Sequence, residues 1–216
     1  MSTIAIIGGS GPEGRGLALR FAIAGHAVII GSRDAGRAQE AAAKLLEVRA
    51  GLPITGDANA PAAGAADTVI LSVPFEGLAA TVRDLAPQLA GKLVISVVAP
   101  FTFENGSAIA TIVTEGSAAE LVRDLLPTAR VASAFHNLSA RDLLKPELRL
   151  EGDVGVCADD AGTRAETIAL ADQVGGMRGV DAGTLVNSRY LEELTALLVN
   201  LNKIHKAHAT VRFVGL

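Results

Sequence analysis

The chain has 216 residues, of which 50% are hydrophobic, and its formal net charge is −4. This length allows one substantial hydrophobic core but not two full domains, and the longest apolar runs, 68–74 and 93–100, are far too short to span a membrane. Aromatic residues make up only 3% of the chain and it has no basic tract, which argues against a nucleic-acid-binding surface.

The first expected strand, 4–7, runs directly into a glycine-rich loop that opens a helix. Gly9, Gly11 and Gly14 fit the spacing G-x-G-x-x-G, in which a helix N-terminus and backbone N–H groups face a diphosphate. In this motif Gly9 permits the tight turn, Gly11 leaves room for the diphosphate and Gly14 lets the helix pack closely on the strand. A second strand at 26–30 completes a β-α-β unit, so a dinucleotide-binding site is predicted. Its candidate residues are Gly8, Gly9, Ser10, Gly11, Pro12, Glu13 and Gly14.

The end of the second strand indicates which dinucleotide is bound. Proteins that bind NAD usually place Asp or Glu there to accept a hydrogen bond from the ribose 2′-OH. This chain instead has Ser32 and Arg33, with Arg37 one turn further on. Ser32 can donate to a 2′-phosphate, and the two arginines, four apart at the start of a helix, share one face and can close on it as a pair. NADP is therefore predicted; the alternative is that both arginines are solvated helix-start residues with Asp34 as their partner.

Alternating strand and helix patterns continue and predict an α/β, Rossmann-type, doubly wound and mostly parallel sheet. Helices are expected at 34–50, 59–66 (capped by Asn59) and 76–89, and strands at 52–56, 67–73 and 92–98. The strand 67–73 ends in Ser72, Val73 and Pro74, because proline cannot continue a central strand. Ligands of open parallel sheets lie outside the carboxyl ends of the strands, so these three residues are candidates for contact with the nicotinamide half of the dinucleotide. The alternative is a proline that only ends a strand.

No long period is visible at 102–115, and a loop of this length inside a domain is more often functional than idle. A capping box at Ser117 then begins a helix, and the next strand is expected at 131–135. That strand ends at His136, the candidate catalytic residue. Three roles are open for His136: an acid–base group, a donor that orients a ligand, or an ordinary surface residue.

The remaining histidines and the single cysteine give no metal site. His205 and His208 are three apart, but no third ligand has suitable spacing. Cys157 lies in an apolar run and cannot form an internal disulfide, which is typical of a core residue in a cytoplasmic protein. No basic region precedes the first strand, so no signal peptide is expected.

The C-terminal third is expected to contain a strand at 154–157, a helix at 162–174 and a long helix opened by Asn187 or Ser188. Leucines recur in the long helix at intervals of three and four residues, which predicts one apolar stripe. Such a stripe packs against its own sheet or against a second subunit, and a homodimer is favoured.

Several short motifs occur in order along essentially the whole chain. They are 4–17 with its glycine loop, 31–33 with Arg37, the turn at 73–74, the capping box at 117–120, Asp181-Ala182-Gly183 and Asn187-Ser188-Arg189. In these stretches the chain resembles the NADPH-dependent reductases of coenzyme F420, also called F420H2:NADP oxidoreductases. The resemblance implies reversible hydride transfer between NADP(H) and a deazaflavin, in a homodimer, with the two redox rings stacked.

The resemblance also implies roles for individual residues. Ser10, Ser32, Arg33 and Arg37 are then expected at the 2′-phosphate. Val73, Pro74, Ala99, Pro100, His136 and Leu138 are expected to flank the paired rings, and Thr195 to touch the deazaflavin. Residues 1–150 are expected to form the NADP-binding Rossmann domain, and 151–216 a smaller C-terminal part that completes the acceptor site and carries the dimer contact.

The tail departs from the family pattern, which is glycine-rich, because 203–213 contains no glycine. Two alternatives therefore stay open beside the deazaflavin reductase. One is an NADPH-dependent reductase of a flavin, ferric chelate or other acceptor, as in the cytosolic domain of related membrane reductases. The other is a non-catalytic NADP-binding sensor module.

Overall fold

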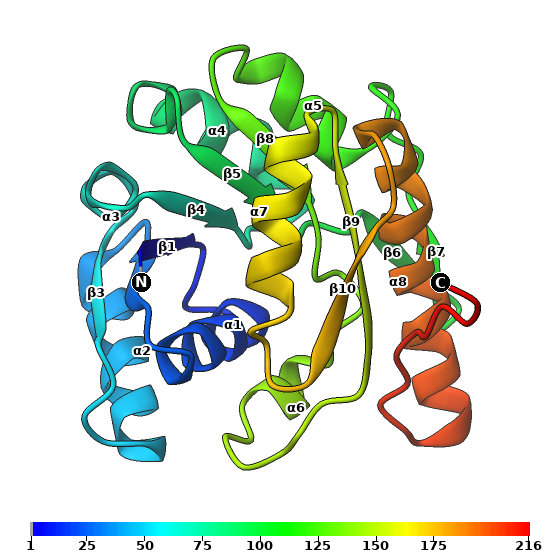
Figure 1. Ribbon diagram of the computed structural model, residues 1–216, viewed down its shortest axis with the longest axis horizontal. Coiled ribbons are helices and arrows are strands. Elements are labelled where there is room, and N and C mark those ends of the chain that lie inside the picture. Colours follow the sequence, from blue (N-terminus) through cyan, green and yellow to red (C-terminus); the bar gives the residue numbers. More distant parts are fainter. Residues whose placement is uncertain (1) are drawn as a thin grey trace.

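The computed structural model describes residues 2–216, which form a central sheet with helices on both faces (Figure 1). The strands of the sheet are β1 (Thr3–Ile7), β2 (Ala27–Ser32), β3 (Ile54–Ala58), β4 (Thr68–Leu71), β5 (Leu93–Ser96), β8 (Arg130–Ser133), β9 (Gly152–Ala158) and β10 (Met177–Asp181). The helices are α1 (Pro12–Ile23), α2 (Ala35–Val48), α3 (Asn59–Ala65), α4 (Phe75–Leu89), α5 (Ala118–Leu125), α6 (Ala140–Leu143), α7 (Ala161–Ala171), the 3₁₀ turn η1 (Leu185–Asn187) and α8 (Ser188–His205).

The strand order is β3-β2-β1-β4-β5-β8-β9-β10, which confirms the predicted doubly wound fold. The strands from β3 to β8 are parallel, β9 runs antiparallel to β8, and β10 runs parallel to β9. The chain order reverses between β1 and β4, which is where ligands bind in open sheets of this kind.

Alternate residues of the strands supply two separate cores, one on each face of the sheet. In β1, Ile4 and Ile6 pack with α1, α2 and α7, whereas Ala5 and Ile7 pack with α3, α4 and α5. This division follows from the period of two along a strand, and strands buried on both faces are continuously apolar. The apolar runs in the sequence therefore mark the central strands.

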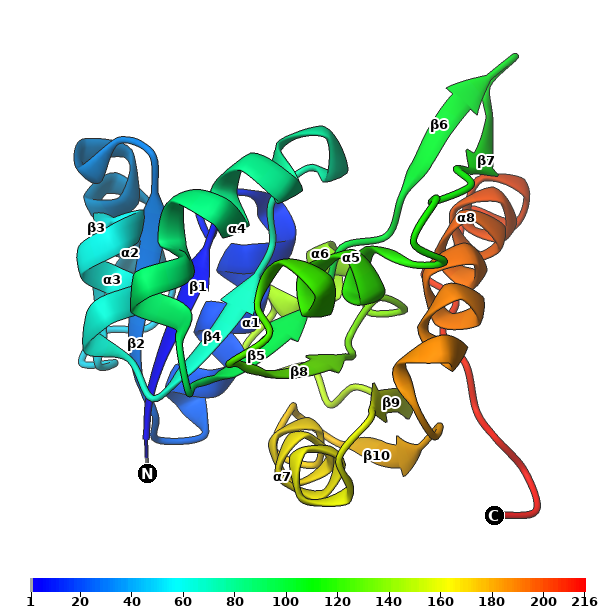
Figure 2. The same cartoon turned by 90° about the horizontal axis from the view of Figure 1, so that it is seen from above.

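The segment expected as a loop contains a β-hairpin, so that expectation was wrong. Its strands are β6 (Phe101–Glu104) and β7 (Ser107–Ala110), which pair antiparallel. Asn105 and Gly106 turn the chain with φ of 49° and 80°, and Asn-Gly is the favoured dipeptide for a two-residue hairpin turn. Figure 2 shows the hairpin projecting from the sheet beside α8. Asn200 of α8 bonds both the N–H and the carbonyl oxygen of Ala108, so a contact distant in sequence holds the hairpin.

Other elements were shifted or missed. Ala58, not Asn59, is the N-cap of α3, and Asn59 begins the helix without a side-chain cap bond. The short helix α6 and the strand β10 were not expected, because neither has a distinct periodic pattern. The capping box was correct, since Ser117 Oγ accepts a hydrogen bond from Glu120 N at 3.0 Å. No helix among residues 2–216 is both long enough and apolar enough to cross a bilayer.

A buried carboxylate attaches α8 to the start of α5. Glu192 is 2% exposed and accepts hydrogen bonds from the backbone N–H groups of Ala118 (2.8 Å) and Ala119 (3.1 Å). Burial, with smaller effects from Glu120 and Glu193, raises the pKa of Glu192 to about 7 despite these bonds. This contact helps to fix the helix that carries Thr195.

Stability is expected to depend on pH through Glu192. Because its pKa rises from 4.5 to about 7 on folding, the folded state binds the proton more tightly between these values. The free energy of unfolding therefore falls as pH rises through this window, by about 3 kcal/mol for this group. Urea unfolding at pH 5, 6 and 7 should show this fall in the wild type and a flatter profile in Glu192→Gln. Glu47→Gln, at an exposed site on α2, should keep the wild-type slope; a full slope in Glu192→Gln would refute the assignment.

Candidate functional site

The glycine loop between β1 and α1 is packed too tightly for side chains at three of its glycines. Gly8 has φ of +75°, and a Cβ there would lie 2.6 Å from the carbonyl oxygen of Ser72. A Cβ on Gly9 would lie 2.6 Å from the oxygen of Ile6, and one on Gly14 2.5 Å from Gly9 Cα. The turn was assigned to Gly9, but the residue with positive φ is Gly8. Gly9 is required for space, and Gly14 for the close approach of α1.

Gly11 and the helix start remain open toward the outside of this loop. A Cβ on Gly11 would meet only the oxygen of Gly8, at 3.6 Å. Gly11 is the N-cap of α1 without a side-chain cap bond, and Pro12 occupies the first turn. N–H groups at such a start are free to bind an anion, and the helix dipole favours negative charge there. The loop therefore fits a diphosphate.

The residues at the end of β2 can bind a second anion, because they offer a hydroxyl group and two guanidinium groups. Ser32 is buried and its Oγ accepts from Asp34 N at 3.3 Å, while Arg33 and Arg37 are exposed. Among residues 2–216 neither arginine forms an ion pair. Asp34 caps α2 by accepting from Arg37 N at 3.2 Å, so its carboxylate is used as a helix cap. Arg33 precedes this cap, which corrects the expectation that both arginines lie on the helix. The two guanidinium groups are free to meet a phosphate.

Three candidate turns follow neighbouring strands at one edge of the sheet. Ser72–Pro74 follows β4, Ala99–Pro100 comes after β5, and 136–138 comes after β8. Backbone bonds join these strand ends in series: Ser72 N to the oxygen of Ile7 (2.8 Å), Val97 N to that of Leu71 (3.2 Å), and Ala134 N to that of Ser96 (3.2 Å). We call this the carboxyl edge. It also carries the glycine loop, because Gly8 lies against Ser72 and Val73.

His136 is enclosed at the carboxyl edge. It is 8% exposed, and burial lowers its pKa to about 4, so the imidazole is neutral at pH 7. Its Nε2 lies 3.5 Å from Ser133 Oγ, and its carbonyl oxygen accepts from Thr195 Oγ1 at 3.1 Å. Phe135, just before it, has φ of 70°, a conformation that costs energy in a bulky residue and is common at functional sites. The structure thus brings together His136 and Thr195, which are far apart in sequence.

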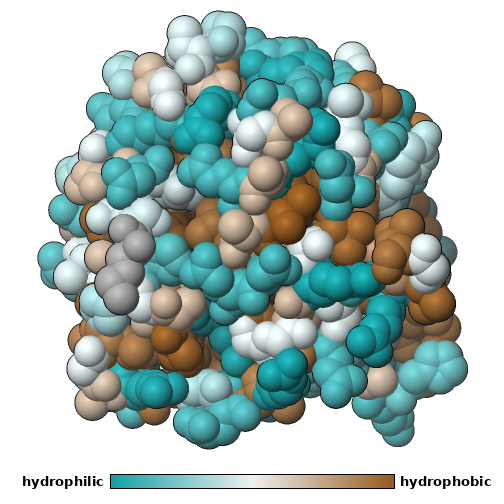
Figure 3. Space-filling model, viewed as in Figure 1, coloured by the Kyte–Doolittle hydropathy of each residue, from teal (hydrophilic) through white to brown (hydrophobic). Residues whose placement is uncertain are grey.

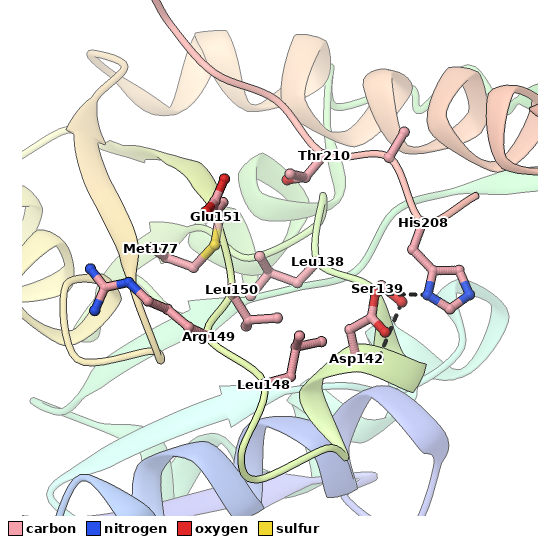
Figure 4. A pocket seen from close by; sticks show the side chains of 11 residues that line it. Leu138, Ser139, Asp142, Leu148, Arg149, Leu150, Glu151, Met177, His208 and Thr210 are labelled. Atoms are coloured by element: carbon pink, nitrogen blue, oxygen red, sulfur yellow. Dashed lines mark hydrogen bonds and ion pairs between the residues drawn. The ribbon is translucent and has the colours of Figure 1, made fainter.

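A cavity of about 240 Å³ opens beside Leu138 (Figure 4). Its apolar side chains include Leu138, Leu150 and Met177, and polar groups surround them. On one side His208 Nδ1 lies 2.7 Å from Asp142 Oδ2, which attaches the C-terminal tail to α6. Sequence reasoning missed this pair, because nothing local links two residues so far apart in the chain.

A second, smaller hollow adjoins His136 under the same tail. It is lined by His136, Leu191, Leu194 and Phe213, among others. Asn137 Nδ2 donates to Thr210 Oγ1 at 2.9 Å, so the tail is also attached to the segment that carries His136. The tail therefore closes one side of the carboxyl edge although it lacks the glycines expected there. Residues 2–216 hold no group of three or more His, Cys, Asp and Glu side chains arranged for a metal ion.

Comparison with known proteins finds a matching family model and similar sequences over nearly the whole chain. The family model described as coenzyme F420-dependent NADP oxidoreductase matches residues 3–100. An F420-dependent NADP reductase from Methanothermobacter thermautotrophicus is 42% identical over 205 residues, covering 92% of this chain and 88% of that protein. The F420-dependent NADP reductase from Methanocaldococcus jannaschii is 38% identical, covering 96% and 95%.

A solved structure extends the comparison to the whole fold. The crystal structure of a protein from Arthrobacter sp. FB24, provisionally described as an F420-dependent NADP reductase, is 25% identical to this chain. The match has a TM-score of 0.85 and covers 99% of this chain and 100% of that one. The similarity therefore includes the C-terminal third and its long helix.

Proposed function

Because this chain belongs to the family of coenzyme F420-dependent NADP oxidoreductases, it transfers a hydride between NADP(H) and coenzyme F420, and we propose that its carboxyl edge carries this reaction. The observation that best supports this location is the meeting of four loops there. The glycine loop, the turns after β4 and β5, and the His136 segment converge, and Thr195 of α8 bonds His136.

The proposed roles divide along this edge. The glycine loop and the start of α1 hold the diphosphate, and Ser10, Ser32, Arg33 and Arg37 hold the 2′-phosphate. The two redox rings lie between the turns after β4 and β5 and the segment of His136 and Leu138, with Thr195 at the deazaflavin. Residues 1–150 thus bind NADP, and residues 151–216 complete the acceptor site.

The hydride transfer itself needs no protein base, and the proton that completes reduction of the deazaflavin comes from water. Bound together, the two coenzymes supply direct hydride transfer between C4 of the nicotinamide and C5 of the deazaflavin. The residues of the carboxyl edge contribute proximity, alignment and exclusion of water. His136, neutral and buried, orients or polarises a ring, because its low pKa leaves one ring N–H as a donor at pH 7.

The experiment is to mix the protein with NADPH and oxidised coenzyme F420 and follow the loss of deazaflavin absorbance. Rapid bleaching supports the proposal. Reduction of FMN or a ferric chelate alone supports the other acceptor class, and tight NADPH binding without any acceptor supports a sensor module.

Replacing His136 with alanine is expected to lower kcat about 2- to 10-fold without abolishing turnover, because one hydrogen bond from a neutral donor, worth roughly 0.5–1.5 kcal/mol, is lost while hydride transfer itself remains. Stopped-flow reduction of F420 by NADPH measures this. His205→Ala, at an exposed position in the last turn of α8, serves as the control. An unchanged rate in His136→Ala would remove His136 from the site.

We further propose that the protein is a homodimer that uses the outer face of α8. Tyr190, Leu197 and Ile204 are spaced seven apart on this helix and are 64%, 53% and 70% exposed. The predicted stripe therefore packs only partly on the protein itself, and Figure 3 shows apolar residues along the side where α8 lies. Sedimentation velocity should give twice the chain mass; a monomer at micromolar concentration contradicts the proposal.

We also propose a cytoplasmic location. Cys157, the only cysteine, is fully buried, and burial raises its pKa to about 11, so it stays a thiol. A buried thiol suits a reducing compartment. Cell fractionation with an antibody to the protein tests this.

A further inference from the structure

Glu13 is a polar residue beside the glycine loop whose side chain has no hydrogen-bond partner among residues 2–216. It lies in the first turn of α1, directly after the loop. Its Oε1 is buried and receives no hydrogen bond from any residue between 2 and 216. Buried carboxyl oxygens are almost always hydrogen-bonded in native proteins, so an unpaired one at a ligand site suggests that the ligand supplies the partner.

The contacts of α1 show which way Glu13 faces. Residues three, four and seven apart share one face of a helix, which places Glu13, Gly16 and Arg20 together. A Cβ on Gly16 would lie 2.5 Å from Leu143 Cβ of α6, and Arg20 Nε donates to the carbonyl oxygen of Leu143 at 2.9 Å. This face of α1 is therefore turned toward α6. Glu13 lies one turn nearer the glycine loop, on the side of the segment 136–139 that leads into α6.

Glu13 is neutral at pH 7. Burial raises its pKa to about 8, and no charged group contributes to this change. The charged groups on the packed elements have other partners. Arg20 bonds the carbonyl oxygens of α6 and the following loop, and Asp142 bonds Lys145 and His208. Arg15, on α1 itself, has a buried Nε without a hydrogen-bond partner in the part of the chain that the structure describes, and it does not contribute to the pKa change of Glu13. A protonated carboxyl offers one donor and one acceptor side by side.

We propose that Glu13 is a cofactor-binding residue whose carboxyl group pairs with the carboxamide of the nicotinamide. A primary amide presents the complementary acceptor and donor, so two parallel hydrogen bonds fix the ring about its bond to the ribose. The adenine end is excluded, because the residues proposed for the 2′-phosphate lie at the end of β2, where Gly9 N donates to the oxygen of Gly31 at 3.0 Å, whereas the face of α1 that carries Glu13 is turned toward α6. The inference rests on the proposed binding of NADP at this edge.

The test compares NADPH with 2′-phospho-ADP-ribose, which has the same phosphates but no nicotinamide. Dissociation constants are measured by calorimetry at pH 6.5 and pH 9 for the wild type, Glu13→Gln and Glu13→Ala. In the wild type, NADPH should lose about tenfold more affinity between the two pH values than 2′-phospho-ADP-ribose does, because Glu13 ionises. Glu13→Gln should abolish this excess loss, since an amide keeps the donor and acceptor at both pH values. Glu13→Ala should bind NADPH about tenfold more weakly than the wild type at pH 6.5 and 2′-phospho-ADP-ribose equally well.

The control is Glu76→Gln, which changes an exposed carboxylate in the first turn of α4 and should behave as the wild type. An equal loss of affinity with pH for the two ligands would overturn the proposal. The ionised carboxylate of Glu13 would then weaken binding of the diphosphate, which both ligands share, and not of the nicotinamide. Wild-type affinity of Glu13→Ala for NADPH at pH 6.5 would overturn it as well. The calorimetry contains no F420, so it tests NADP binding separately from the reaction. A protein that shows the expected binding pattern but fails to reduce F420 would contradict F420 as the acceptor and would leave the role of Glu13 standing.

Discussion

Replacing both Arg33 and Arg37 with alanine is expected to lower the preference for NADPH over NADH by about a hundredfold to ten-thousandfold. Each charged hydrogen bond to the 2′-phosphate contributes roughly 1.5–3 kcal/mol to the binding of NADPH. NADH lacks this phosphate, so its binding does not depend on these bonds. The structure favours this role, because both guanidinium groups are exposed and neither forms an ion pair within residues 2–216.

The measurement is kcat/KM for each nucleotide in the double variant and in the two single variants. Arg49→Ala removes an exposed arginine at the other end of the same helix and should leave the preference unchanged. If the double variant weakened NADPH and NADH equally, the two arginines would have no part in distinguishing the phosphate.

Replacing Arg20 with alanine is expected to destabilise the protein by about 3–5 kcal/mol, the range for removing one partner from a buried charged network. Arg20 is 3% exposed, and burial lowers its pKa. Its guanidinium donates to four carbonyl oxygens, those of Asp142 (2.8 Å), Leu143 (2.9 Å), Lys145 (2.6 Å) and Leu148 (2.9 Å). Truncation leaves these oxygens without their donor and loosens the segment that lines the cavity beside Leu138.

Urea and thermal unfolding measure this effect. For a chain of this size, the loss corresponds to a fall in Tm of about 10 °C. Arg83→Ala, at an exposed site on α4, should change the free energy of unfolding by less than about 0.5 kcal/mol. A similarly small change in Arg20→Ala would mean that the four carbonyls find other partners.

Much of the site was predictable because its causes are local. The apolar runs become central strands because both faces of a parallel sheet are buried. The glycine loop is required by contacts between neighbouring backbone segments, so its spacing between a strand and a helix could be recognised in the sequence, and its role at a diphosphate stays a prediction. Even here, which glycine adopts positive φ was not predictable: Gly8 does so because it must pass the turn at Ser72 and Val73.

The rest depended on contacts between residues that are distant in the chain. The hairpin of β6 and β7 is held by Asn200, and Thr195 reaches His136 only because α8 crosses that loop. The burial that makes Glu13 neutral and lowers the pKa of His136 is a property of the packed structure. The sequence by itself determined the alternation of strands and helices along the chain and the position of the glycine loop, because periodicity and backbone sterics act over a few residues. The tertiary structure alone decided the protonation states and the closure of the carboxyl edge by the tail, because desolvation and long-range hydrogen bonds arise only once distant segments meet.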